Sequence, residues 1–456
     1  MSRTLGFKLG AIALLVVLLM IPLSMIDGLV SERQHLHDAV LDDIARSSSY
    51  SQQITGPLLV VPYRRTVREW KTHEKSGERF LEEREVRSRL YFLPERFVLD
   101  GEVKTELRYR GIYEARLFHS ASRISGRFEL PAQFGIREHF ADYRFEPAFL
   151  AVGISDIRGI KNDLKLRLDD RTLSFAPGSG DTYLGNGVHV PLAVLDGKGA
   201  QAFDFAFDLQ LQGTGQLDVI PVGRDSRVTL QSDWPHPRFF GNYLPSEREI
   251  RPDGFSANWQ TSFFATNMEE VLRNCVRSPH CESFGGPSIS VSFVDPVDQY
   301  LKSDRAIKYA LLFIALTFAA FFLFEVLKRL AVHPVQYGLV GLALALFYLL
   351  LLSLAEHLDF ALAYGISASA CVLLIGVYVS SVLRSWRRGG GFTALLAALY
   401  AMLYAVLSAE DYALLMGSLL VFGLLATVMM LTRKLDWYGV GRGDTLRRVG
   451  AGPDAA

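Results

Sequence analysis

Six stretches of the sequence are long and apolar enough to cross a membrane, and this feature restricts the fold more than any other. A helix that crosses roughly 30 Å of hydrocarbon needs about 20 apolar residues, and it must satisfy its own backbone groups. The predicted spans are residues 5–26, 306–327, 335–355, 360–383, 392–409 and 412–432. The sequence therefore predicts an α-helical, multi-pass membrane protein in contact with the lipid bilayer.

Charged residues are concentrated between the first span and the second. Residues 1–26 contain only Arg3 and Lys8, and residues 306–432 contain 11 charged residues. Residues 27–305 contain 35 basic and 40 acidic residues, an ordinary content for a soluble domain. This distribution predicts a large soluble domain inserted between spans 1 and 2. It is unlike that of a cytosolic globule, a disordered chain or a nucleic-acid-binding protein, so no nucleic-acid partner is expected.

The resulting organisation has five parts. They are an N-terminal transmembrane anchor (1–28), a juxtamembrane helix (29–50), a β-rich domain (51–305), a five-span transmembrane bundle (306–432) and a tail (433–456). We interpret the first span as an uncleaved anchor and not as a signal peptide. Its apolar core is long, and the residues that follow it lack the small-x-small cleavage pattern.

Basic residues near the span ends predict the orientation of the spans. With the N-terminus in the cytoplasm, the loops and the tail assigned to that side hold Lys328, Arg329, Arg384, Arg387, Arg388, Arg433, Lys434, Arg442, Arg447 and Arg448. The short loops assigned to the other side hold acidic residues and no Lys or Arg: Glu356, Asp359, Glu410 and Asp411. Both termini are therefore expected in the cytoplasm and the large domain outside it, which is the periplasm of a bacterial cell.

The soluble domain shows the two-residue period of half-buried strands. Phe203, Phe205, Phe207, Leu209 and Leu211 alternate with mostly polar residues. Similar alternation recurs around residues 103–109, 217–222, 228–230 and 289–293. These patterns predict a mainly antiparallel β domain, a sandwich or two stacked sheets.

The chain has three cysteines, and two of them lie close together in the soluble domain. Cys275 and Cys281 are separated by five residues, and a disulfide between them is expected outside the cytoplasm. A metal site that uses His280 as a third ligand is the alternative, although no fourth ligand with zinc-type spacing lies nearby. Cys371 falls within the fourth span and is interpreted as a packing residue.

The sequence lacks the common catalytic motifs, so no metal or other cofactor is expected. It has no His-Glu-x-x-His, Gly-x-Ser-x-Gly, Ser-x-x-Lys or phosphate-loop motif. The remaining candidates for chemistry are ionisable residues at the ends of the spans, Glu325, Glu356, His357 and Asp411. The alternative is structural: Glu325 pairs with Lys328 on the same helix face, and the others are polar turn residues at the water interface.

A rigid segment rich in proline and aromatic residues follows the central strands. Trp234, His236 and Phe239 lie in or beside Trp-Pro-His-Pro, where two prolines restrict the backbone. These side chains form a candidate binding loop. A corner between strands, with its rings in the core, is the other interpretation.

Several longer motifs occupy residues 110–113, 155–159, 232–237, 241–245, 308–325, 333–341, 348–357 and 433–438. They resemble the CreD family of inner-membrane proteins, and the resemblance covers nearly the whole chain. It implies a bacterial inner-membrane protein whose production is linked to a two-component system. It also implies an association with cell envelope integrity, envelope stress, colicin tolerance and the β-lactam response. It supplies no catalytic residues and no cofactor.

Two functional hypotheses follow from these observations. The first is a non-enzymatic protein whose periplasmic β domain binds an envelope component or a partner protein while the bundle anchors it. The second is a membrane enzyme or transporter that acts on a lipid-linked envelope substrate through the ionisable residues at the span ends.

Overall fold

The structure is a computed structural model that describes residues 3–72, 79–278, 281, 284–295, 299–328, 332–383, 385–408 and 413–433. The chain divides into two compact units. One contains residues 1–38 and 297–456 and is helical, and the other contains residues 39–296 and is mainly β. Each unit is described separately below.

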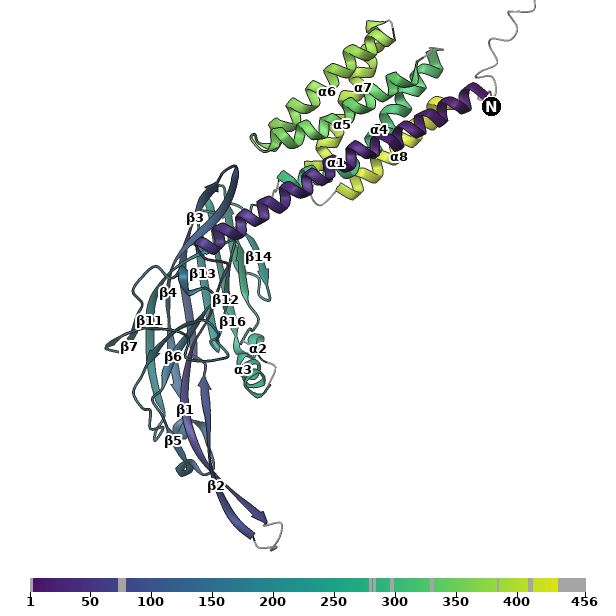
Figure 1. Ribbon diagram of the computed structural model, residues 1–456. Coiled ribbons are helices and arrows are strands. Elements are labelled where there is room, and N and C mark those ends of the chain that lie inside the picture. The colour runs from purple at the N-terminus through teal and green to yellow at the C-terminus, as the bar shows by residue number, and fades with distance from the viewer. Residues whose placement is uncertain are drawn as a thin grey trace, which may run out of the picture. The chain divides into compact units, whose positions relative to one another are not determined.

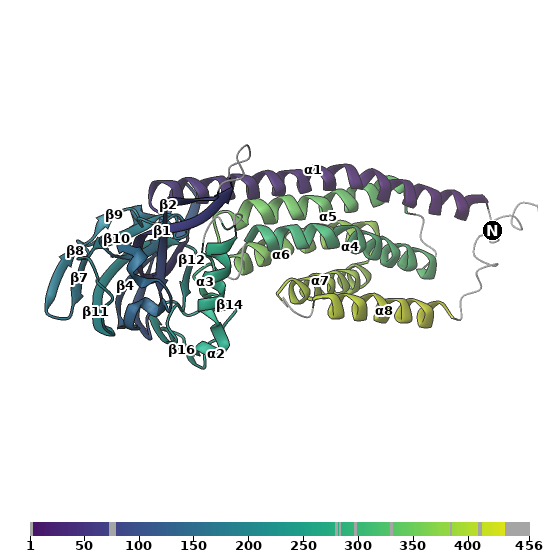
Figure 2. The same ribbon diagram turned by 90° about the horizontal axis from the view of Figure 1, so that it is seen from below.

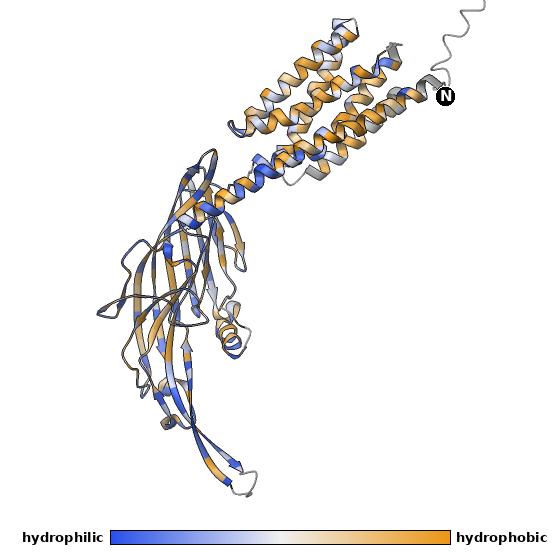
Figure 3. Cartoon of the chain, viewed as in Figure 1, coloured by the Kyte–Doolittle hydropathy of each residue, from blue (hydrophilic) through white to orange (hydrophobic). Residues whose placement is uncertain are grey.

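The helical unit is built from long apolar helices (Figure 1). They are α1 (Arg3–Ser47), α4 (Gln299–Lys328), α5 (Pro334–Ala355), α6 (Phe360–Val382), α7 (Trp386–Ser408) and α8 (Ala413–Thr432). Within the described residues, five of them, α1 and α4 to α7, are long and apolar enough to cross a membrane. Each of the six predicted spans coincides with one of these helices, and Figure 3 shows how apolar residues dominate them.

Side chains from α1, α4, α5, α6 and α7 share one apolar core. The rings of Phe318 and Phe321 pack against Tyr337, and Phe321 also contacts Phe392 of α7. Successive helices lie side by side in this bundle, as Figure 2 shows for α4, α5 and α6. In lipid, such packing holds the helices together because burial from water contributes little there.

The first membrane helix and the predicted juxtamembrane helix are one element. Helix α1 runs without a break from Arg3 to Ser47 and includes Pro22 in its interior. The segment expected to form the juxtamembrane helix (29–50) therefore continues the first helix as far as Ser47.

The β unit consists of two sheets. The nine-stranded sheet has the order β14-β17-β12-β1-β6-β10-β9, with β2 and β5 also paired to β1. Its strands are β1 (Gln52–Thr72), β2 (Arg79–Phe92), β5 (Tyr143–Phe145), β6 (Phe149–Ile154), β9 (Ala176–Pro177), β10 (Gly187–Pro191), β12 (Gln216–Ile220), β14 (Arg238–Gly241) and β17 (Ile289–Ser292).

The eight-stranded sheet has the order β15-β16-β13-β3-β4-β11-β7-β8. Its strands are β3 (Arg96–Arg110), β4 (Tyr113–Leu130), β7 (Lys165–Leu168), β8 (Arg171–Ser174), β11 (Gln201–Thr214), β13 (Asp225–Ser232), β15 (Glu247–Arg251) and β16 (Gly254–Ser262). Two short helices, α2 (Phe263–Thr266) and α3 (Met268–Arg277), follow β16. The pairing is antiparallel except for β1 with β12 and β3 with β13, so the predicted mainly antiparallel β domain is confirmed.

Aromatic side chains fill the space between the two sheets. The alternating phenylalanines of β11 point inward, and Phe205 and Phe207 are almost fully buried. Phe118 of β4 lies 5.1 Å from Phe293, just after β17, which joins the two sheets through ring contacts. Burying rings of this size supplies much of the apolar stabilisation of such a core.

Strand β1 pairs with four other strands along its length. Residues 52–55 pair with β12, residues 54–60 with β6, residues 63–65 with β5 and residues 59–72 with β2. Beyond residue 65, β1 and β2 continue as a two-stranded ribbon that extends from the sheet (Figure 1).

Replacing the Phe118 ring should weaken the contact between the sheets. Phe118→Ala removes a fully buried ring, so we expect a loss of about 3–5 kcal/mol in the free energy of unfolding. Thermal unfolding of the purified full-length protein, followed by circular dichroism of the β signal, measures this loss. Tyr109→Ala is the control, because Tyr109 is 67% exposed and should change the midpoint little. Equal midpoints for the two variants would contradict the packing described here.

Candidate functional site

One buried carboxylate joins three helices of the bundle. The Glu325 side chain, near the end of α4, forms an ion pair with the Lys8 ammonium group of α1. The Tyr337 hydroxyl of α5 donates a hydrogen bond to Oε2 of Glu325 at 2.8 Å, and the Val332 backbone N–H donates one to Oε1 at 3.0 Å. Glu325 is only 5% exposed, so it needs these partners to offset its lost hydration. The arrangement fits a structural link between α1, α4 and α5.

The sequence interpretation named Lys328 as the partner of Glu325, whereas the structure supplies Lys8. The two residues lie 317 positions apart, so local spacing could not reveal the pair. A weak signal was present, because Lys8 is one of two charged residues in the first 26. Isolated ionisable groups in apolar segments tend to pair with one another.

Two of the other predicted membrane-end residues, Glu356 and His357, lie at the opposite end of α5. A carboxylate oxygen of Glu356 lies 3.4 Å from Nε of Arg33 on α1, and the adjacent His357 is exposed. Nearby, the Asp359 carboxylate accepts a hydrogen bond from the Ala361 backbone N–H and thereby caps the start of α6. This capping is a structural role.

These ionisable residues do not form one centre. Glu325 contacts Tyr337 in the first turn of α5, and Glu356 follows the last turn. These two positions are 19 residues apart in the sequence, which corresponds to roughly 28 Å at ~1.5 Å per residue. Glu325 therefore shares no site with Glu356 or His357, and Asp411 lies outside the described residues.

The segment that was a candidate binding loop packs mainly into the β core. Trp234 is 4% exposed, and the Arg116 guanidinium carbon lies 3.9 Å from its ring centre. Phe239 contacts the rings of Phe255 and Trp259 from the opposite sheet. Of the three candidate residues, only His236 is exposed, and its ring lies against Trp234. These contacts favour the corner between strands over a binding loop.

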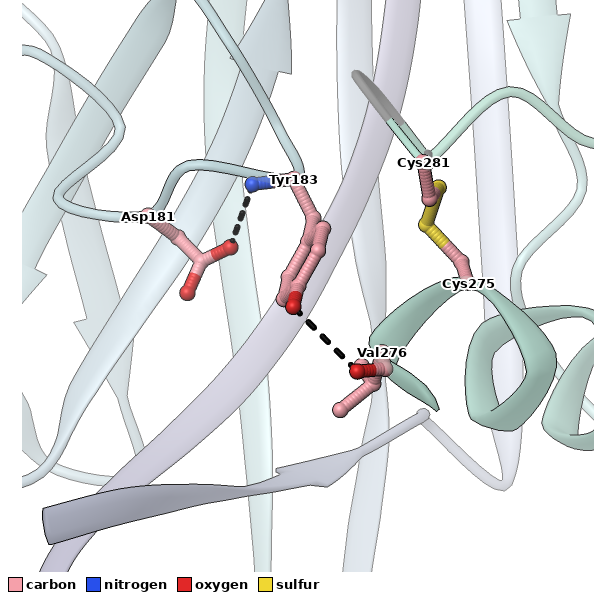
Figure 4. The surroundings of a disulfide bond; sticks show 5 residues. All are labelled: Asp181, Tyr183, Cys275, Val276 and Cys281. Atoms are coloured by element: carbon pink, nitrogen blue, oxygen red, sulfur yellow. Dashed lines mark hydrogen bonds between the residues drawn. A yellow bond between two sulfur atoms is a disulfide. The ribbon is translucent and has the colours of Figure 1, made fainter. Parts of the chain in front are cut away.

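The structure joins Cys275 and Cys281 in a disulfide (Figure 4). Cys275 lies on α3 and Cys281 follows it, so the bond fixes the end of this helix. The Tyr183 hydroxyl donates a hydrogen bond to the Val276 backbone carbonyl at 3.3 Å and ties the same helix to the loop before β10. With both thiols bonded, neither can act as a metal ligand here, and His280 lies outside the described residues.

A large groove lies beside α3, and no motif in the sequence indicates it. This α3 groove has a volume of about 1030 Å³ and is lined by the end of β2, by the adjoining ends of β4 and β11, and by α3. Its apolar lining includes Leu90, Phe92, Leu130, Phe134, Leu272 and Val276. A concave surface of this size, partly apolar with a few polar groups, is typical of a binding site.

The arginines that line the α3 groove differ in whether they form ion pairs. Arg224 lies within 4 Å of the Glu95 and Glu269 carboxylates. Arg273 and Arg277, one turn apart on α3, line the groove and are exposed. Neither forms an ion pair with a carboxylate among the described residues. The α3 side of the groove therefore carries two guanidinium groups that can receive an anion.

A buried carboxylate next to the α3 groove holds two side chains of β2 in place. Asp181 accepts hydrogen bonds from Arg89 at 2.5 Å and from the Tyr91 hydroxyl at 2.8 Å. Burial and the hydrogen bond to Asp181 raise the pKa of Tyr91 well above its usual value. Tyr91 thus stays protonated and acts as a donor that holds β2 in place.

Within the described residues, no group of three or more His, Cys, Asp or Glu side chains could hold a metal ion. The geometry of the α3 groove is that of a binding surface with apolar and cationic parts. The cluster formed by Glu325, Lys8 and Tyr337, here called the Glu325 cluster, has the geometry of a structural link.

The fold defines a multi-pass helical membrane protein that carries a large β-sheet domain between its first two long apolar helices. A sequence profile of the family described as "Inner membrane protein CreD" matches residues 4–438. Inner membrane protein CreD of Escherichia coli (strain K12) is 38% identical over 441 residues, which cover 96% of this chain and 95% of that protein. The chain therefore belongs to the CreD family of inner-membrane proteins, which confirms the resemblance of its motifs.

The similarity to solved structures is weak. An M1 zinc metallopeptidase from Deinococcus radiodurans aligns with a TM-score of 0.20 and 8% identity, over 44% of this chain and 42% of that chain. A two-domain M1 zinc metallopeptidase aligns with a TM-score of 0.19 and 7% identity, over the same shares of the two chains. Likeness at this level supports no conclusion about function.

Removing the cation from the Glu325 cluster should destabilise the bundle. Lys8→Met leaves a buried carboxylate without its counter-charge, and breaking a buried pair in this way costs about 3–5 kcal/mol. The double variant Lys8→Met/Glu325→Gln should recover much of the loss, since a neutral amide needs no cation. Thermal unfolding in detergent measures both effects.

Lys308→Met is the matched control for Lys8→Met. Lys308 pairs with Asp304 on an exposed helix surface, and such pairs contribute at most about 1 kcal/mol. If Lys8→Met lowers the midpoint no more than Lys308→Met, the proposed link between α1 and α4 is wrong.

Proposed function

We propose that this chain is a non-enzymatic inner-membrane protein that supports cell envelope integrity. Its β domain lies in the periplasm and binds an envelope component or a partner protein. The observation that carries this proposal is the α3 groove, about 1030 Å³ in volume, with apolar walls and the exposed Arg273 and Arg277 on α3. A helical bundle attached to such a domain anchors the binding surface at the membrane.

The distribution of basic residues supports the proposed orientation. Arg387 and Arg388, in the first turn of α7, lie on the side assigned to the cytoplasm. Glu356 and Asp359, between α5 and α6, lie on the side assigned to the periplasm. Both chain termini then lie in the cytoplasm.

The alternative, a membrane enzyme or transporter for a lipid-linked substrate, needs titratable groups gathered at one site. Glu325 is held by Lys8 and Tyr337 at one end of α5, and Glu356 lies at the other end. Among the described residues, the candidate groups are thus separated or engaged in structural contacts, and the binding role is favoured.

The orientation can be tested with single introduced thiols. Lys198→Cys places a thiol on the β domain, at a side chain that is 84% exposed. A membrane-impermeant maleimide should label it in cells whose outer membrane is permeabilised. Native background should be low, because Cys275 and Cys281 are bonded and Cys371 is buried. Arg387→Cys should be labelled only after the inner membrane is broken, and the reverse pattern would refute the topology.

The α3 groove can be tested by filling it. Gln201→Trp adds an indole to a half-buried position that lines the groove, so we expect loss of envelope-stress rescue in a deletion strain at normal protein levels. Gln260→Trp is the matched control, on an exposed strand position elsewhere in the same sheet. Full rescue by Gln201→Trp would show that the α3 groove is not the functional site.

A further inference from the structure

The end of β2 presents its edge, and not one of its faces, to the α3 groove. Five consecutive residues, Arg89 to Leu93, line the groove. A strand face would expose alternate residues only, since successive side chains point to opposite sides. The side chains of Arg89 and Tyr91 reach Asp181, whereas Phe92 packs on Phe134 at 5.8 Å on the other side. Asp181 lies on one side of the strand and Phe134 on the other, so the strand edge faces the groove between them.

This edge lacks a second neighbour. In the described part of the chain, β2 pairs with β1 alone, through Leu59↔Phe92 and the pairs that follow. No other backbone hydrogen bond reaches residues 89–93 within that part. A strand edge without a neighbour offers a row of N–H and C=O groups to another extended chain.

The opposite wall of the α3 groove supplies charge and apolar surface. Leu272 and Val276 of α3 face the groove, and Arg273 and Arg277 lie beside them. Leu130 and Phe134 add buried apolar lining. An added strand would lie about 4.8 Å from β2, with side chains directed alternately to its two sides. Carboxylates on that strand can reach the two guanidinium groups.

We propose that the α3 groove binds an extended, acidic and partly apolar peptide segment of another protein, which adds as a strand to the outer edge of β2. This inference rests on the proposed binding function and names its ligand class. A hydrocarbon chain would match the apolar walls, but it would leave the backbone groups of β2 without partners as it displaced their water. A peptide satisfies those groups and the arginines together.

The test begins with a displayed library of random peptides of about 12 residues, selected on the full-length protein in nanodiscs. A selected peptide, labelled with fluorescein, is then titrated by fluorescence anisotropy. We expect acidic residues and alternating apolar residues in the selected sequences. Arg273→Gln/Arg277→Gln should weaken binding about tenfold or more, since both charge-assisted hydrogen bonds to the peptide carboxylates are lost. Arg171→Gln/Arg227→Gln, at exposed positions of β8 and β13, should leave binding unchanged.

Backbone N-methylation of the peptide distinguishes strand addition from other modes of binding. Methyl groups on the amides that face β2 should abolish binding, and those on alternate amides should be tolerated. If every methylated peptide binds equally well, or if no selected peptide depends on Arg273 and Arg277, the proposal is wrong. Binding of oleate that is lost in Gln201→Trp, without any such peptide, would assign the groove to lipid and would also overturn it.

Failure of this inference can be separated from failure of the proposed function. If Gln201→Trp loses envelope rescue but no peptide of this kind binds, the periplasmic binding role stands and the peptide ligand is discarded. If Gln201→Trp rescues fully, the α3 groove has no role in the cell, whatever it binds in vitro.

Discussion

Every backbone N–H and C=O group in this protein needs a hydrogen-bond partner, and the two units meet this requirement differently. In the bundle, each helix satisfies its own groups, as a segment in hydrocarbon must. In the β unit, strands distant in sequence satisfy one another's backbone groups. Strand β1, for example, pairs with β2, β5, β6 and β12. The outer edge of β2, where pairing stops, faces the α3 groove.

Features with a local signal could be predicted from the sequence. The span predicted at 335–355 matches α5 (Pro334–Ala355), because length and apolar content define a helix in lipid. The alternating phenylalanines identified β11, because a half-buried strand repeats every two residues. Helix α3 was missed, although Met268, Leu272 and Cys275 have helical spacing and are buried. Its ten residues are too few for a strong periodic signal.

Features that depend on distant contacts could not be predicted. The partner of Glu325 lies 317 positions away, so the sequence suggested the nearer Lys328. The α3 groove is assembled from β2, β4, β11 and α3, and no one of these segments carries a motif for it. The aromatic residues around Trp234 were ambiguous, because a buried corner and an exposed loop use the same rigid residues. Only the contacts with Arg116, Phe255 and Trp259 separate them.

The disulfide on α3 affects how another chain can approach β2. Cys275 and Cys281 hold the end of the helix that forms the wall opposite the strand edge. An extended segment that pairs with β2 would have to fit between the strand edge and this wall. The covalent bond keeps that wall in place beside the unpaired strand edge.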